Sequence, residues 1–172
     1  MRLFGLMLLL AALAGCAVTD HSPGSATLER DAQWALLPIA NHTEVPQAGL
    51  RAETIAEGVL RSRGVARLLH YPIALNPDTM LQASERKAQA DALKWAREAG
   101  ARYALTGAVD EWRYKVGIDG EPAVGLALQV IDPASGAVLW SGVGAKSGWS
   151  REALAAVAQK LMRELFDSAK LQ

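Results

Sequence analysis

The sequence predicts an α/β fold, a single layered domain with a mixed sheet in the order β-α-β-α-β-β-β-α. Two observations lead to this prediction. In the first half, each of two apolar runs lies next to a segment with helical spacing, which is typical of parallel strands joined by helices. In the second half, three alternating segments separated by short turns precede a helical segment, which indicates an antiparallel meander and a closing helix.

The first sixteen residues have the form of a lipoprotein signal. Arg2 gives a positive start, residues 6–12 (LMLLLAA) form an apolar run, and residues 13–16 (LAGC) close it as a bacterial lipobox. The run is too short to span the hydrocarbon layer of a bilayer, which takes about 20 residues. We expect cleavage before Cys16 and a diacylglycerol on its thiol. An ordinary secretory signal with an incidental cysteine is the alternative.

The position of Cys16 favours the lipoprotein. It is the only cysteine in the chain, and it stands where lipidation requires one. Ala17 follows in place of an aspartate, which in lipoproteins generally implies export to the outer membrane. An acylated thiol is not available for a disulfide or a metal site. The chain therefore divides into a lipoprotein signal peptide, a lipidated flexible tether and a periplasmic α/β domain, at residues 1–15, 16–30 and 31–172.

The charge balance argues against a nucleic-acid partner. The 172 residues include 18 basic and 18 acidic side chains, and loss of Arg2 with the signal leaves 17 against 18. Nucleic-acid binding requires a basic patch, which this composition does not indicate. The residues left after cleavage are enough for one domain with a sizeable core.

Three elements follow the tether. The apolar run at residues 34–40 predicts a buried strand, in which Pro38 indicates an edge position or a bulge. Pro46 opens a helix that runs to Arg63 and is stopped by Gly64. Residues 65–71 then predict a short second strand.

The next helix is predicted for residues 84–99, with alanines on its inner face, and the longest strand for residues 102–117. In that strand the apolar positions change parity after Asp110 and Glu111. A bulge would explain the change, and so would a strand that projects beyond its own core. The second option would leave two aromatic residues free to contact a partner. The candidate oligomer contacts are these two residues and the arginine at the start of the strand: Arg102, Trp112 and Tyr114.

A hairpin, two strands and a helix complete the chain. Asp119-Gly120 is a hairpin signal, and alternating segments at residues 122–132 and 137–147 predict the last two strands. The closing helix is expected to begin at Ser150. With Ser150 as N-cap, Trp149 could pack on Leu154 as a hydrophobic staple. The alternative is a tryptophan presented to the membrane interface, where its ring is favoured.

No catalytic or metal-binding pattern emerges. The three histidines lack metal-ligand spacing, and Asp110 and Glu111 are neighbours that point to opposite faces of a strand. Residues 142–147 (GVGAKS) lack the glycine that precedes the lysine in a phosphate-binding loop. We therefore expect no metal, no cofactor other than a covalent lipid on Cys16, and no enzymatic activity.

Several features together resemble one protein family. They are the lipobox, the first strand with its helix, the passage at residues 99–107 (AGARYALTG), the hairpin at residues 130–138 (VIDPASGAV) and the Gly148-Trp149 pair. This combination looks like the PelC family of outer-membrane lipoproteins in the Pel exopolysaccharide export system. The domain type is also similar to the periplasmic domains of curli-secretion (CsgG) and TolB-like proteins.

The resemblance implies a function in the biofilm matrix. It implies a closed ring, expected to be a dodecamer, at the periplasmic face of the outer membrane below the PelB barrel. An acidic surface of the ring would guide a cationic, galactosamine-rich polymer, and Asp119 and Glu121 at the hairpin tip are our candidates for it. Turn chemistry alone also explains Asp119. The resemblance further implies acyl chains such as palmitate on Cys16 and the burial of Trp149 in outer-membrane lipid.

A second function belongs to another class. A TolB-like regulatory lipoprotein would bind and activate an envelope enzyme such as a peptidoglycan synthase, and would need a long tether. The tether predicted here has about fourteen residues, or roughly 50 Å when fully extended. This length favours a domain that stays close to the outer membrane.

Overall fold

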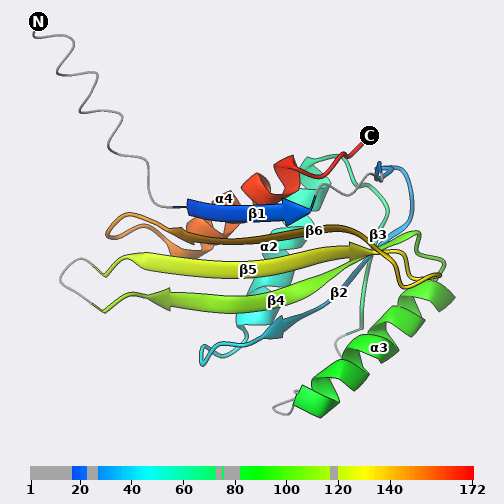
Figure 1. Cartoon of the computed structure of the whole chain (residues 1–172), viewed down its shortest axis with the longest axis horizontal. Coiled ribbons are helices and arrows are strands. Elements are labelled where there is room, and N and C mark those ends of the chain that lie inside the picture. The colour runs from blue at the N-terminus through cyan, green and yellow to red at the C-terminus, as the bar shows by residue number, and fades with distance from the viewer. Residues whose placement is uncertain (1–16, 23–26, 73–74, 76–81, 117–119) are drawn as a thin grey trace, which may run out of the picture.

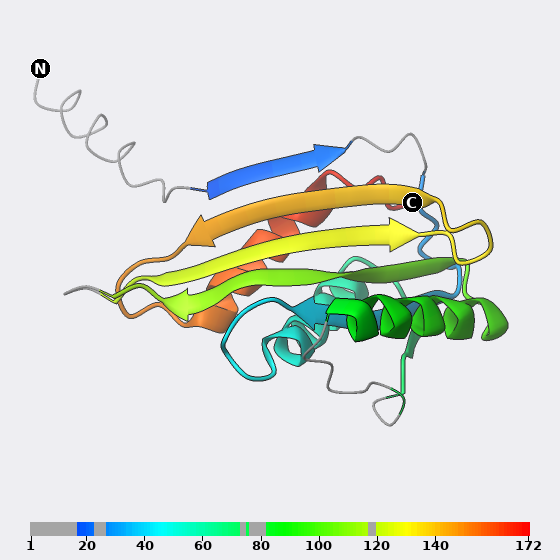
Figure 2. The ribbon, with the colours of Figure 1, turned by 60° about the horizontal axis from the view of Figure 1, so that its bottom comes forward.

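The computed structural model describes residues 17–22, 27–72, 75, 82–116 and 120–172. Within these residues, six strands form one mixed sheet in the order β1-β6-β5-β4-β2-β3. Helices α2 and α4 lie on one face of the sheet, and α3 lies on the other face beside β2 (Figures 1 and 2). In chain order the elements are β1 (Ala17–Ser22), β2 (Trp34–Asn41), α2 (Ala48–Ser62), β3 (Leu68–His70), α3 (Gln82–Glu98), β4 (Tyr103–Tyr114), β5 (Pro122–Ile131), β6 (Val138–Ser147) and α4 (Leu154–Asp167).

The predicted fold class is confirmed, with one additional strand. β1 pairs antiparallel with β6 from Ala17, opposite Lys146, to Ser22, opposite Ser141. Further along, Leu28 is buried and forms a β-bridge with Leu171. The flexible tether predicted for residues 16–30 is therefore wrong wherever this segment is described. Without β1, β6 would present an unpaired row of backbone groups, and β1 satisfies them despite its polar composition.

Pro38 lies at a bulge in β2. The register between β2 and β4 shifts between Leu36 and Ile39. β2 is an interior strand, but its pairing with β3 ends at Leu36, so Pro38 lies past the end of β3 as well as at the bulge. The Thr106 hydroxyl donates a hydrogen bond to the Pro38 carbonyl at 2.9 Å. The Ile39 N–H donates to the Glu53 carboxylate, also at 2.9 Å. Side chains thus pair backbone groups that the bulge removes from the ladder.

The change of parity in β4 also comes from a bulge. The register between β4 and β5 shifts between Val109 and Glu111, so Val109 and Trp112 both face the core. Trp112 is only 2% exposed, whereas Tyr114 is 50% exposed. The projecting strand is therefore wrong, and Trp112 does not stand free at the end of β4, because most of its ring packs in the core of the protomer.

Small residues set the spacing between the layers. At Gly49 in α2, a Cβ atom would come within 2.1 Å of the Ile39 carbonyl oxygen, so only glycine permits this close approach to β2. On the other face, Ala92 and Ala96 of α3 pack on a small cluster that includes Leu37. The alanine face predicted for this helix is confirmed at these two positions.

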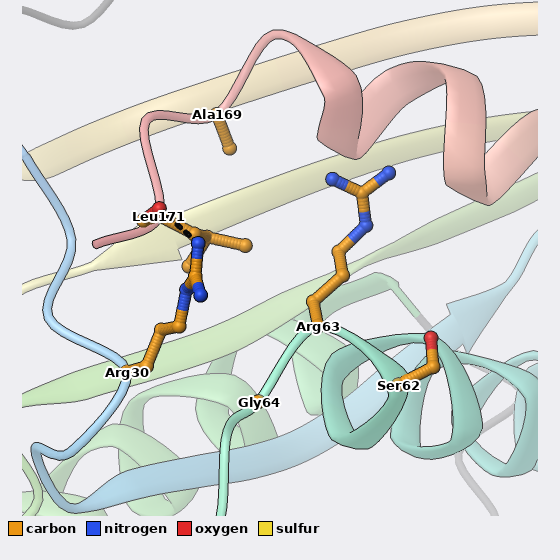
Figure 3. Close-up of a pocket in the computed structure, with 6 residues that line it drawn as sticks. All are labelled: Arg30, Ser62, Arg63, Gly64, Ala169 and Leu171. Atoms are coloured by element: carbon orange, nitrogen blue, oxygen red, sulfur yellow. Dashed lines mark hydrogen bonds between the residues drawn. The ribbon is translucent and has the colours of Figure 1, made fainter.

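Two arginines tie the last turn of α4 and the segment after it to the rest of the domain. Arg63 follows α2 and donates to the carbonyl oxygens of Arg163 at 2.8 Å and Phe166 at 3.0 Å. Across a hollow of about 460 Å³, Arg30 donates to the Leu171 carbonyl at 2.8 Å (Figure 3). Carbonyls at a helix C-terminus have no partner within the helix. Arg63 therefore stabilises the end of α4, and Arg30 holds the segment that follows the helix.

Candidate functional site

Four strand ends meet at one end of the sheet, which we call the hairpin end (Figure 1, left). The register pairs Ala17 with Lys146, Tyr114 with Pro122, and Ala123 with Ser147. Thus β1 begins, β4 ends, β5 begins and β6 ends at the hairpin end. Two connecting segments start from it: residues 115–121, which link β4 to β5, and the 148–153 loop, which leads into α4.

The hairpin end exposes large apolar side chains. Val18 is 69% exposed, Tyr114 50% and Trp149 58%, and Val116 is fully exposed. They come from β1, from β4 and the residues after it, and from the 148–153 loop. Large apolar residues gathered at one end of a protein indicate an interface with a membrane or a partner.

The 148–153 loop presents Trp149 without a staple. α4 begins at Leu154 with Ala153 as its N-cap, so the expected N-cap at Ser150 is wrong. Arg151 has a left-handed backbone (φ 69°), which turns the chain before the helix. Trp149 therefore lies four residues before the N-cap, and the staple geometry, which needs the residue directly before the cap, does not apply.

Glu152 holds this loop in place. Its carboxylate accepts hydrogen bonds from the Trp149 N–H at 3.2 Å and from the Lys160 ammonium at 2.6 Å. The bond from Lys160 is the main reason that the pKa of Glu152 lies below its ordinary value. The Tyr114 hydroxyl donates to the Glu152 carbonyl and accepts from the Leu154 N–H, both at 3.2 Å. The loop backbone is thus fixed on both sides while the indole stays exposed.

Comparison with solved structures then identifies the family. The chain is similar to the PelC dodecamer from Paraburkholderia phytofirmans, with 39% identity and a TM-score of 0.75 over 91% of this chain and 100% of that one. The chain belongs to the PelC family. A second crystal form, of a PelC variant from the same organism, matches with 40% identity and a TM-score of 0.74, over 89% of this chain and 97% of that one.

Other comparisons bear only on the fold of this PelC-family chain. Lipoprotein GNA1162 from Neisseria meningitidis has 17% identity and a TM-score of 0.57, over 79% of this chain and 96% of that one. No family model matches the sequence, and no curated protein matches it. The two PelC structures confirm the resemblance to the PelC family that the sequence indicated.

The structure places only some of the predicted site residues of this PelC-family chain at the hairpin end. Tyr114, Glu121 and Trp149 lie at the hairpin end, and Glu121 is exposed there. Arg102 lies at the opposite end of β4, with its guanidinium 3.8 Å from the Asp132 carboxylate of the same chain. Asp119 and Cys16 lie outside the described residues. Ala17, the residue that follows Cys16 in the chain, lies at the hairpin end.

A basic residue, Lys115, also lies near the predicted acidic tip. Lys115 donates from its backbone N–H to the Glu121 carbonyl at 2.7 Å, and its ammonium donates to the Ser147 hydroxyl at 2.6 Å. The tip is therefore not uniformly acidic within one protomer. A purely acidic path would have to arise where several copies meet.

Sequence reasoning missed the role of Glu152. The signal that could have revealed it is the spacing of three between Trp149 and Glu152, the spacing of a capping box. Within the described ranges, no three His, Cys, Asp or Glu side chains cluster as metal ligands do. No helix among them has the length and apolar composition needed to cross a bilayer.

Proposed function

We propose that this PelC-family chain is a non-catalytic lipoprotein of an exopolysaccharide export machine, anchored to the periplasmic face of the outer membrane. The observation that carries the proposal is the convergence at the hairpin end. Ala17, directly after the proposed lipidation site, and the exposed Trp149 lie at the same end of one sheet. The sheet register thus allows the acyl chains and the indole to reach one membrane surface.

The lipid and the tryptophan have complementary roles in this proposal. Each buried CH₂ of an acyl chain contributes about 0.8 kcal/mol, so several chains on Cys16 make a durable anchor. Trp149 adds orientation, because amphipathic rings are favoured at the headgroup level. With β1 docked on β6, the chain between Cys16 and the domain is short, which supports a domain held against the membrane. The same shortness disfavours the TolB-like regulator, which must reach across the periplasm.

We further propose that the chain forms a closed ring of twelve copies, as its relative from Paraburkholderia phytofirmans does. A ring uses two different surfaces of each protomer and leaves equivalent ends pointing the same way. All hairpin ends would then face the membrane together, and twelve weak membrane contacts would act as one strong contact.

In the ring, Asp119 and Glu121 are our candidates for the surface that guides a cationic polymer toward a PelB-type barrel. Repetition around a ring concentrates carboxylates even though one copy is nearly neutral, and a negatively lined path attracts ammonium groups. The support is the position of Glu121, an exposed residue directly before β5 at the hairpin end.

The test is the assembly state and location of the protein purified from its own membranes. Mass photometry in mild detergent should show a species of twelve chains, and fractionation should place it in the outer membrane. A strictly monomeric protein, or one recovered from the soluble periplasm, would overturn the proposal.

A further inference from the structure

A second hollow, of about 420 Å³, opens between α2, the end of β4 and the start of α4. This volume lies within the range of small-molecule sites, about 300–1,000 Å³. The hollow is lined mainly by apolar or aromatic side chains: Ile55, Trp112, Tyr114, Leu154 and Ala155. Two polar residues of α2, Arg51 and Thr54, complete it.

Trp112 in this hollow has a hydrogen-bond donor without an acceptor. Its Nε1–H is the single buried side-chain polar atom without a partner among the described residues. The indole N–H groups of two other buried tryptophans are paired. Trp34 donates to the Glu29 carbonyl and Trp140 to the Ser168 hydroxyl, each at 3.0 Å. Because buried polar groups in folded proteins are nearly always paired, the Trp112 N–H calls for an acceptor from outside the described residues.

Of the other polar residues that line the hollow, Arg51 alone has hydrogen-bond donors that no other described residue uses. The Thr54 hydroxyl donates to the Leu50 carbonyl at 3.0 Å, and the Tyr114 hydroxyl is occupied by its bonds to the 148–153 loop. The guanidinium of Arg51 makes no hydrogen bond or ion pair with another described residue. A matching ligand therefore has oxygen acceptors, a negative charge and an apolar part.

The hollow lies beside the proposed membrane-facing surface. Tyr114 lines the hollow and also bonds the loop that presents Trp149. Leu154, the first residue of α4, lines the hollow as well. A molecule seated in it therefore lies at the hairpin end, where the proposed function places lipid headgroups.

We infer that this hollow binds the headgroup and upper acyl region of an anionic phospholipid. The phosphate lies by Arg51, an ester or phosphate oxygen accepts the hydrogen bond from Trp112, and the acyl chain contacts Ile55 and Leu154. The inference rests on the proposed membrane seating. The lipid site adds a preference for anionic lipid, which contact of Trp149 with the membrane alone does not require.

The indole resonances of the protein provide the test. In ¹H–¹⁵N spectra of the chain from Ala17 onward, which contains every described helix and strand, short-chain phosphatidylglycerol is added below its micelle concentration. The Trp112 N–H should move downfield and saturate, while those of Trp34 and Trp140 stay in place as internal controls. Phosphatidylcholine of the same chain length should bind about tenfold more weakly, the value of one charge-assisted hydrogen bond.

Two variants separate the lipid site from general effects. Arg51→Ala should remove the preference for phosphatidylglycerol, and Arg97→Ala, which changes an exposed arginine on α3, should keep it. An unmoved Trp112 resonance, or an equal preference in Arg51→Ala, would overturn the inference. Inorganic phosphate that gives the same shift would also overturn it, in favour of a phosphate site.

Two further outcomes separate this inference from the proposed function. A Trp112 shift that grows with protein concentration in the absence of lipid would show that a second copy fills the hollow, which would overturn the lipid site and leave the ring intact. Saturable lipid binding by a protein that is monomeric and periplasmic in cells would support the lipid site and overturn the proposed function.

Discussion

The variant Trp149→Ala shows whether Trp149 is a structural residue or a membrane contact, because the two roles predict different losses of folding stability and of membrane affinity. The side chain is 58% exposed, so only 42% of its surface is buried in the protomer. Truncation of a fully buried tryptophan costs about 3–5 kcal/mol, which scales to about 1–2 kcal/mol here. The exposed part of a ring that buries roughly 200 Å² would contribute about 3 kcal/mol on entering lipid. Membrane affinity should therefore fall more than a hundredfold in Trp149→Ala, while the fold persists.

Urea unfolding and vesicle sedimentation of the chain from Ala17 onward measure these two effects. Trp140→Ala is the matched stability control, because that ring is only 3% exposed and stacks on Phe166. Brominated lipids should quench the wild-type emission, and Trp149→Phe should lose that quenching. A stability loss in Trp149→Ala as large as in Trp140→Ala, with unchanged vesicle binding, would refute the reasoning.

Four other predictions follow from the same structure and proposal. Cys16→Ser should release the protein from the outer membrane, measured by fractionation; a tightly bound variant would contradict lipid as the main anchor. Asp119→Asn should lower export of a cationic polymer more than Asp119→Glu; equal losses with lower melting temperatures would assign the residue to the turn. Arg63→Ala should cost about 1–3 kcal/mol in urea unfolding, because helix-end carbonyls lose their donors; an unchanged midpoint would contradict this. The pKa of Glu152 is lowered in the fold. Its carboxylate therefore adds to the free energy of unfolding at neutral pH, and this stabilisation is lost as the pH falls below about 4.3. In Glu152→Gln, the free energy of unfolding should decrease less between neutral and acid pH than in the wild type, measured from unfolding curves at several pH values. An equal decrease in both proteins would contradict the role of Lys160.

Much of the fold could be predicted from local patterns. The alternation in residues 122–132 and 137–147 identified two strands of the meander, because each has one face in the core. The parity change after Asp110 predicted either a bulge or a projecting strand at the end of β4. The structure has the bulge, which lets Trp112 pack in the core together with Val109. β1 could not be predicted, because its pairing depends on the open edge of β6 rather than on its own composition.

Residues of the candidate site could be proposed from the sequence only where a single residue stands out by itself. Cys16 and Trp149 stand out by type and position in the sequence. The start of α4 was placed too early because Ser150 is a favourable cap residue, whereas Glu152 bonds back to Trp149 and delays the helix. The phospholipid hollow combines side chains from α2, β4 and α4 that are far apart in the sequence. No periodicity could have brought these together.

Orientation on the membrane tests the central claim most directly. With Cys16 acylated, nitroxide labels can be attached to a single introduced cysteine at Ser150→Cys, in the 148–153 loop, or at Ser135→Cys, in the turn between β5 and β6. These positions lie at opposite ends of the sheet, and both are exposed. In the lipidated protein on vesicles, electron paramagnetic resonance with polar and apolar relaxing agents reports the depth of each label. The proposal predicts a label at headgroup depth at position 150 and a fully aqueous label at position 135. Equal aqueous exposure at both positions would contradict it.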